Sequence, residues 1–372
     1  MNDAPENMIY GHSTAESRWA RLGPYYAMFP LKFAFETVKK YSNRGDYILD
    51  PFAGRFSTIF SGSIIGRKGV GIEINPVGWL YGKTKTRPAP LQTVLKRLET
   101  VYKEKGHYKK AMEEMPEFFR MCFCDEVLQF LLAVRENLNW RNREDDATLM
   151  AIILVYLHGK RCQSLSNQMR MTKAMGINYS IKWWKEHNME NPPEIAPYEF
   201  IKTKLEWRYK KGIPETNPDT EIILGDSAEV LPQIVGHGSG KFSFLFTSPP
   251  YCSVTNYYSD QWLRYWMLGG ADNPQYLKEK YKGRFINKND YYDLLNTVFG
   301  QCSKLMKEKS FVYVRTDIRQ FTKETTIDIL TKHFSGYSMD VCPAEISRKT
   351  QTEVMGNKSS EKGEVDIIME RR

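Results

Sequence analysis

The stretch DYILDPFAGRFSTIFSGSIIGRKGVGIEI, residues 46–74, decides the fold of this chain. Two short apolar runs within it, residues 47–50 and 70–74, are typical of buried strands, and residues 58–66 between them have a helical pattern. A further helical stretch, residues 31–42, precedes the first run. The order of strand, helix and strand predicts a βαβ unit, whose two strands lie parallel in one sheet.

The rest of the chain divides where the hydrophobic pattern changes. Residues 88–218 are rich in charged, aromatic and methionine residues and have helical patterns without strand alternation. Short apolar runs then return at residues 221–226, 242–248 and 310–317, with a helical stretch at residues 289–306. We therefore expect an α/β fold in which residues 1–87 and 219–372 build a doubly wound sheet. Residues 88–218 form a helical insertion far longer than an ordinary loop.

Composition limits the class of protein. With 372 residues and 41% hydrophobic content, the chain can build one large α/β domain with an added module. The formal net charge of +9 favours an anionic partner, nucleic acid above all. The six cysteines lack the spacing of a zinc site or a disulfide framework, so we expect no metal. We expect a cytoplasmic location, because neither a signal peptide nor a membrane span is evident.

Acidic residues end three of the predicted strands, at the edge where open α/β sheets bind ligands. Asp50 begins the turn to Gly54, whose missing side chain lets the backbone approach a ligand. Glu73 ends the next strand, where an acidic residue can bind two ribose hydroxyls. Asp226 follows a third strand and offers an acceptor for an adenine amino group. Any one of these could be an ordinary turn, but the three in order predict a nucleoside-cofactor site.

The fourth strand ends in Ser248-Pro249-Pro250-Tyr251, which is the most specific motif of the chain. Prolines have no N–H, so carbonyls of this segment and the Ser248 hydroxyl can accept both hydrogens of a planar amino group on a base. The nitrogen then becomes more tetrahedral and more nucleophilic. Tyr251 offers a flat face for a base swung out of its duplex. The motif therefore predicts methylation of an exocyclic amino group. The nucleophilic cysteine of cytosine-C5 enzymes follows a proline, whereas here Tyr251 separates Cys252 from Pro250.

These motifs together resemble the amino-directed DNA methyltransferases. The resemblance is carried by Tyr25-Tyr26-Ala27-Met28-Phe29-Pro30, by ILDPFAG at residues 48–54, by Glu73 and Asp226, and by the Ser-Pro-Pro-Tyr segment. It implies a Rossmann-like methyltransferase sheet and S-adenosyl-L-methionine as the cofactor. A serine at the first position resembles the cytosine-N4 enzymes, whereas adenine-N6 enzymes more often have Asp or Asn. We therefore expect methylation of cytosine N4 in double-stranded DNA, with adenine N6 as the alternative.

The resemblance also implies which residues hold the cofactor. Phe29 and Pro30 would flank the methionine moiety, Asp50 and Gly54 would lie at its amino acid end, Glu73 at the ribose and Asp226 at the adenine. Their neighbours Phe52, Ala53, Ile74 and Ser227 complete the expected site.

One departure from the family pattern concerns the cofactor loop. The family sequence Gly-Ser-Gly-Thr-Thr is replaced here by Gly54-Arg55-Phe56-Ser57-Thr58. We expect the bulky Phe56 to narrow the cofactor site. An inactive nucleic-acid-binding relative therefore stays open as a hypothesis, as does an RNA methyltransferase, because the same amine chemistry serves RNA.

The insertion is the expected target-recognition region, because basic and aromatic residues alternate in it. The expected DNA contacts are Lys160, Arg161, Arg170, Lys173 and Lys182, together with Arg348 and Lys349 near the C-terminus. Solvated helix faces give a similar composition. The polar run Gln163–Gln168 could present amides to base edges. The resemblance leaves open a partner such as a cognate restriction endonuclease or a defence-system component.

Three further interpretations concern single residues. His158 ends an apolar helical stretch and is more typical of a structural histidine than of a catalytic one. Asn256, Tyr257, Asp260, Gln261 and Trp262 follow the Ser-Pro-Pro-Tyr segment closely enough to line a base pocket. Packing explains Trp262 and Trp266 equally well, because they lie four residues apart on one helical face.

Overall fold

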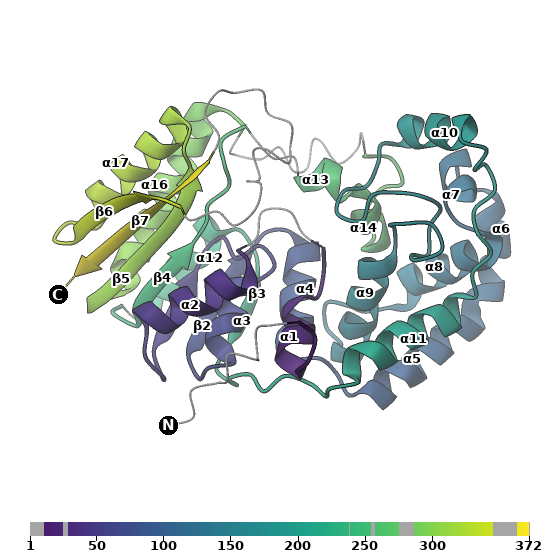
Figure 1. Cartoon of the computed structure of the whole chain (residues 1–372), viewed down its shortest axis with the longest axis horizontal. Coiled ribbons are helices and arrows are strands. Elements are labelled where there is room, and N and C mark those ends of the chain that lie inside the picture. The colour runs from purple at the N-terminus through teal and green to yellow at the C-terminus, as the bar shows by residue number, and fades with distance from the viewer. Residues whose placement is uncertain are drawn as a thin grey trace.

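The computed structural model describes residues 11–24, 29–237, 239–253, 257–274, 286–344 and 363–371. Two lobes lie side by side, one built on a β-sheet and one built of helices, with α1 and α4 between them (Figure 1).

The sheet contains seven strands within the described residues, in the order β3-β2-β1-β4-β5-β7-β6. The strands are β1 (Tyr47–Asp50), β2 (Lys68–Glu73), β3 (Glu221–Leu224), β4 (Phe242–Thr247), β5 (Met306–Asp317), β6 (Ser338–Pro343) and β7 (Glu364–Arg371). The first five strands in the sheet order are parallel, and β7 runs antiparallel to both β5 and β6. The predicted βαβ unit is confirmed, since β1 and β2 pair in parallel around α3 (Ser57–Ser63).

Helices cover both faces of the sheet, as a doubly wound fold requires. The flanking helices are α1 (Ala15–Ala20), α2 (Leu31–Tyr41), α3, α4 (Pro76–Thr86), α12 (Ser227–Gly236), α16 (Lys288–Leu305) and α17 (Gln320–His333). Alternate residues of β1 and β4 enter different cores: Ile48 and Phe244 face one, Leu49 and Leu245 the other. Strands buried on both faces have nearly continuous apolar sequences, and this is why these strands could be predicted.

The second lobe consists of helices and connecting segments. It contains α5 (Leu91–Lys103), the short 3₁₀ helix η2 (Glu104–Tyr108), α6 (Lys109–Glu113), α7 (Glu117–Cys122), α8 (Asp125–Asn137), α9 (Glu144–Tyr156), α10 (Ile177–Glu186) and α11 (Pro197–Tyr209). From Asp146 to Val155 every residue of α9 is buried, as expected of a helix at the centre of its lobe.

Two further helices join this lobe from a distant part of the chain. They are α13 (Tyr257–Asp260) and α14 (Trp262–Met267), the first described helices after the Ser-Pro-Pro-Tyr segment. The ring of Trp262 lies 5.1 Å from that of Phe118, and Trp266 lies 4.6 Å from Phe119. The packing interpretation of both tryptophans is therefore confirmed. The chain thus returns to the helical lobe after β4, whereas the sequence predicted that all of residues 219–372 belong with the sheet.

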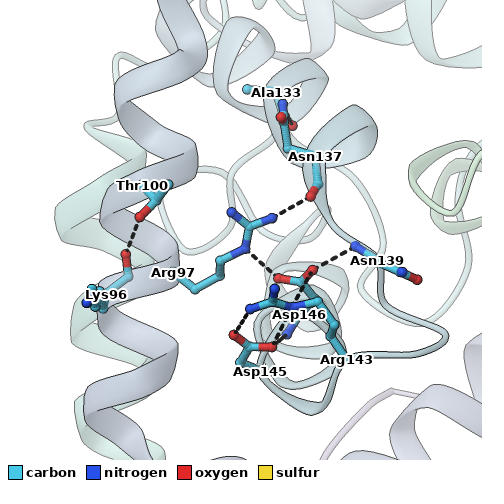
Figure 2. Close-up of polar contacts among 9 residues, drawn as sticks. All are labelled: Lys96, Arg97, Thr100, Ala133, Asn137, Asn139, Arg143, Asp145 and Asp146. Carbon is cyan, nitrogen blue, oxygen red and sulfur yellow. Dashed lines mark hydrogen bonds and ion pairs between the residues drawn. The ribbon is translucent and has the colours of Figure 1, made fainter.

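A buried carboxylate holds three parts of the helical lobe together (Figure 2). Asp146, at the start of α9, accepts hydrogen bonds from Arg97 Nε of α5 at 2.6 Å and from the backbone N–H of Asn139 at 2.7 Å. Its side chain is 1% exposed, whereas that of Arg143, 3.6 Å away, is 57% exposed. Because a buried charge is costly unless it is paired, both donors are needed.

We expect Asp146→Ala to lower the free energy of unfolding by about 2 kcal/mol, because it leaves Arg97 and the Asn139 amide without their acceptor. Glu99→Ala is the matched control: it removes an exposed ion pair with Lys103 on the surface of α5 and should leave the free energy of unfolding nearly unchanged. Urea unfolding of both variants measures the difference. Equal losses would show that burial of Asp146 contributes nothing.

Candidate active site

The carboxyl ends of β1 and β4 are joined by a side-chain hydrogen bond. Thr247 Oγ1 donates to Asp50 Oδ1 at 2.7 Å, and the Phe52 amide donates to the same oxygen at 3.2 Å. Burial raises the pKa of Asp50 to about 6, against the opposing hydrogen bonds from Thr247, Thr58 and Phe52. Asp50, expected at the amino acid end of the cofactor, thus connects the cofactor loop to the residue that precedes Ser248. Thr247 was not predicted, although a hydroxyl at the end of an apolar strand was a signal for it.

Glu73 ends β2, and its side chain accepts a hydrogen bond from the cofactor loop. Its Oε2 accepts from the Gly54 amide at 2.7 Å and its Oε1 from the Asn75 amide at 2.8 Å. Burial raises the pKa of Glu73 to about 8, and the charge of Asp50 adds to the shift, while the two amides oppose it. Each carboxyl oxygen can accept a second hydrogen bond, so acceptors remain for ribose hydroxyls. The next side chain, Ile74, is 51% exposed and offers an apolar surface beside the carboxyl.

The raised pKa predicts how stability depends on pH. In the unfolded chain Glu73 has its ordinary pKa of 4.5, so its contribution to stability is complete below that pH and is lost as pH rises to about 8. Glutamine cannot ionise, so any cost of losing one of the two backbone hydrogen bonds to its amide nitrogen does not change with pH. We expect the Tm of the wild type without cofactor to fall relative to that of Glu73→Gln between about pH 5 and pH 8.5.

Calorimetry at several pH values measures this difference in Tm. Glu229→Gln, which changes an exposed carboxyl in the first turn of α12, should keep a constant offset from the wild type. Parallel Tm curves for the wild type and Glu73→Gln would contradict the prediction.

The end of β3 lies against the same loop. Asp226 caps α12 by accepting from the Ala228 amide at 2.9 Å, and the Ser227 hydroxyl donates to the Pro51 carbonyl. The Gly225 amide donates to the Glu73 carbonyl at 3.0 Å. Two carboxyls and the exposed Ile74 at one sheet edge suit the hydroxyls, amino group and ring of a nucleoside. The residues present therefore fit S-adenosylmethionine.

The remaining residues of the expected cofactor site are Phe29, Pro30, Phe52 and Ala53. The Phe29 ring is buried and stacks on Phe246 of β4 at 4.6 Å, while Pro30 is exposed and precedes α2. The Ala53 amide donates to the Ile72 carbonyl at 3.0 Å, and Phe52 is half-buried. Tyr25–Met28, which began the resemblance, lie outside the described residues.

The expectation that Phe56 narrows the cofactor site is wrong. The Phe56 side chain is fully buried in the core between β2 and α4. A Cβ added to Gly71 or Gly82 would come within 2.6 Å or 2.2 Å of its ring, so two glycines make the room that the ring fills. Phe56 keeps a left-handed backbone, with φ of 62°, which is the conformation that favours glycine.

The Ser-Pro-Pro-Tyr segment directly follows β4, with β1 on one side of that strand and β5 on the other. Ser248 and Pro250 are half-buried and Pro249 is buried. Tyr251 is 3% exposed, and its hydroxyl donates to Glu364 Oε1 at 2.9 Å. The face of Tyr251 is therefore covered in this structure, so the predicted stacking of a base on it would require neighbouring residues to move.

The predicted DNA-contacting residues of the insertion differ in their surroundings. Lys160 and Arg170 are exposed. Arg161 donates to Asn167 Oδ1 and to the Asn191 carbonyl, Lys173 pairs with Asp260 at 2.6 Å, and Lys182 pairs with Glu186 at 3.7 Å. Arg348 and Lys349 lie outside the described residues.

The prediction that residues 163–168 present amides to base edges is wrong for the centre of this run. Asn167 is fully buried, and its amide donates to the carbonyls of Met121 at 3.0 Å and Met189 at 2.6 Å. Ser164 and Ser166 are buried as well. The run holds the helical lobe together. His158 is also structural, as predicted: it is buried and bonds the Arg170 carbonyl at 2.7 Å.

Residues 260–262 do not form a base pocket as expected; they support the segment 172–175. Asp260 accepts from the Ala174 amide at 2.8 Å through its carbonyl, Gln261 donates to the Thr172 carbonyl at 3.2 Å, and Trp262 donates to the Met175 carbonyl at 3.1 Å. All three are buried. Asn256 and the side chain of Tyr257 lie outside what the structure describes.

Among the described residues no group of three or more metal-binding side chains comes together. In the same part of the chain, no helix has the length and apolar character needed to cross a membrane.

The sheet order, with an antiparallel β7, is that of a Rossmann-like methyltransferase fold. Residues 4–77 match the family model of N6/N4 methyltransferases, described as DNA methylase. This match supports the predicted resemblance to the amino-group DNA methyltransferases over the part of the chain that holds the ILDPFAG motif and Glu73.

Solved structures also resemble the chain, distantly. The rRNA methyltransferase aviRa from Streptomyces viridochromogenes is 10% identical, with 97% of each chain covered and a TM-score of 0.32. A proposed rRNA methylase from Clostridium thermocellum is 6% identical, with 93% of this chain and 99% of that chain covered and a TM-score of 0.34. At such scores neither likeness bears on the substrate. No curated protein matches the sequence.

Proposed function

We propose that the protein transfers a methyl group from S-adenosyl-L-methionine to the N4 amino group of cytosine in double-stranded DNA. The observation that carries this proposal is the hydrogen bond between Thr247 and Asp50. It ties the residue before Ser248 to the first residue of the cofactor loop. The amine-binding segment and the nucleoside-binding edge therefore adjoin, although about 200 residues separate them in the sequence.

The chain's own residues would bind and orient the two reactants. Glu73 and Asp226 would accept hydrogen bonds from the ribose and the adenine, and Ile74 would cover the ring. When bound, S-adenosylmethionine supplies a methyl group on a positively charged sulfur. Ser248 and carbonyls next to Pro249 and Pro250 would accept the hydrogens of the target amine, so that its lone pair is free to form the new bond. The amine then loses one proton to water.

The helical lobe supplies the proposed DNA surface. Exposed Arg170 lies two residues before the segment 172–175, which α13 and α14 contact, and exposed Lys160 follows Gly159, which bridges to Gln168. The segment that α13 and α14 contact thus belongs to the same lobe as the basic residues, and both helices follow the Ser-Pro-Pro-Tyr segment in the chain. Positive charge here suits the phosphates of a duplex. A cognate restriction endonuclease or another defence-system component is the partner that we propose.

Identification of the methylated product tests the proposal. The purified full chain is incubated with S-adenosylmethionine and genomic DNA from a methylation-deficient host, and the DNA is digested to nucleosides for mass spectrometry. We expect N4-methylcytosine. N6-methyladenine would replace the cytosine assignment by the adenine one, and a C5 product or labelling of RNA alone would overturn both. Failure to bind the cofactor in calorimetry would favour a nucleic-acid-binding protein without activity.

A further inference from the structure

Two side chains from the far half of the sheet hold the end of the catalytic loop. The Tyr251 hydroxyl donates to Glu364 Oε1 at 2.9 Å. One residue later, the Cys252 carbonyl accepts from the guanidinium of Arg319 at 2.9 Å. Arg319 follows β5 and Glu364 begins β7, so both lie on the side of β4 away from the cofactor loop.

The guanidinium of Arg319 is itself fixed by Asp317, the last residue of β5. Asp317 accepts from the Arg319 amide at 3.0 Å and, through its other oxygen, from Arg319 Nε. The side chain of Asp317 is completely buried, and that of Arg319 is 21% exposed. A buried carboxylate needs such partners. The pair therefore presents the remaining donors of Arg319 in one direction, toward Cys252.

The backbone of Glu364 is held beside Asp317 by the sheet. It is the register partner of Asp317 in the β5–β7 ladder, and its carbonyl accepts from the Ala344 amide at 3.0 Å. Its backbone thus cannot move without breaking the sheet. Burial raises the pKa of Glu364, while the hydrogen bond from Tyr251 and the charge of Arg315 oppose that rise.

The loop has few means of its own to keep its shape. Pro249 and Pro250 have no N–H to donate. Ser253, directly after the Arg319 contact, has a left-handed backbone with φ of 59°. Such a conformation in a non-glycine residue costs about 1–3 kcal/mol and persists only where the surroundings impose it.

We infer that Arg319 and Glu364 are positioning residues of the catalytic loop, which hold Cys252 and Tyr251 and thereby set the direction of the Ser248–Tyr251 segment toward the target amine. The inference rests on the proposed function. Neither residue needs to touch cofactor or base, because each acts through a residue of the loop. The sequence signal was the charged stretch Arg315–Arg319 at the end of a strand whose neighbour ends in the catalytic motif.

The first test replaces Arg319. We expect Arg319→Met to lower kcat on the order of 100-fold, as for a small misplacement of reacting groups, with KM for DNA and Kd for the cofactor within about twofold. Arg319→Lys, which can reach only one of its two partners, should recover part of the rate. Arg143→Met is the matched control, because Arg143 also pairs with an aspartate two residues away, in the helical lobe. It should behave as the wild type.

The second test is a double-mutant cycle on Tyr251 and Glu364. Tyr251→Phe and Glu364→Leu each remove the hydrogen bond, so the double variant should lose no more kcat than the worse single variant. Glu364→Gln keeps an acceptor and should stay near wild-type kcat. Losses that multiply in the double variant would overturn the role of Glu364.

A third measurement does not need activity. Hydrogen exchange of the Tyr251, Cys252 and Ser253 amides should become faster in Arg319→Met and not in Arg143→Met. Wild-type protein that methylates nothing would overturn the proposed function, and the exchange result would then decide the inference by itself. Unchanged exchange and unchanged kcat in Arg319→Met would overturn the inference, as would a loss of activity matched by a loss of cofactor binding and of Tm.

Discussion

Ser248→Ala should lower kcat by about 10²–10³-fold, the cost of removing one preorganised polar group from a transition state. Ser248 follows the last residue of β4 and lies half-exposed at the sheet edge where the cofactor residues gather. Without its hydroxyl, one hydrogen of the target amine has no acceptor, and the lone pair stays delocalised in the ring. The Kd of the cofactor should not change, because Ser248 has no part in binding it.

The measurement is single-turnover methyl transfer to DNA, with cofactor binding followed by calorimetry. Ser243→Ala is the matched control, since Ser243 lies near the opposite end of the same strand and donates only to the Tyr47 carbonyl. Ser248→Asn should retain more activity than Ser248→Ala because its amide oxygen is an acceptor. A fully active Ser248→Ala would remove this residue from the mechanism.

Phe56→Gly, which restores the residue that the family pattern has at this place, should lower the free energy of unfolding by about 3 kcal/mol. Loss of a buried phenyl ring costs about 3–5 kcal/mol. Relief of the left-handed backbone at φ of 62° returns about 1 kcal/mol. The net loss reflects the cavity between β2 and α4.

A second substitution tests whether the ring and the glycines fit each other. In the wild type, a Cβ at Gly82 would lie 2.2 Å from the Phe56 ring, so Gly82→Ala should destabilise the protein despite the better helix propensity of alanine. In the Phe56→Gly background the same change fills empty space and should stabilise. Urea unfolding of the four proteins gives the sign of each effect. The same sign in both backgrounds would show that Phe56 does not occupy this space.

The parallel strands and their acidic ends could be predicted from sequence because each is a local pattern. Residues 47–50 and 242–247 are apolar throughout, as strands buried on both faces must be. Asp50, Glu73 and Asp226 each end or directly follow a strand, and parallel topology alone brings such residues to one edge. The Ser-Pro-Pro-Tyr motif needs only its own four residues to indicate amine chemistry.

Side-chain direction could not be predicted in the same way. Asn167 lies in a polar run that suggests an exposed surface, but it satisfies the carbonyls of Met121 and Met189 within the lobe. Phe56 stands where the family has glycine, and only the tertiary structure shows that Gly71 and Gly82 make room for it. Trp262 and its helix join a core that begins more than a hundred residues earlier in the chain.

The sequence by itself thus determined the sheet and predicted its ligand-binding edge and the class of chemistry, because backbone periodicity and strand-end residues are local properties. Only the tertiary structure decided that Thr247 ties the two loops together, that Glu73 holds the Gly54 amide, and that Arg319 and Glu364 hold the catalytic loop. Each of these contacts joins residues far apart in the chain. Hydrogen bonds and packing depend on distances of a few ångströms that no local pattern records.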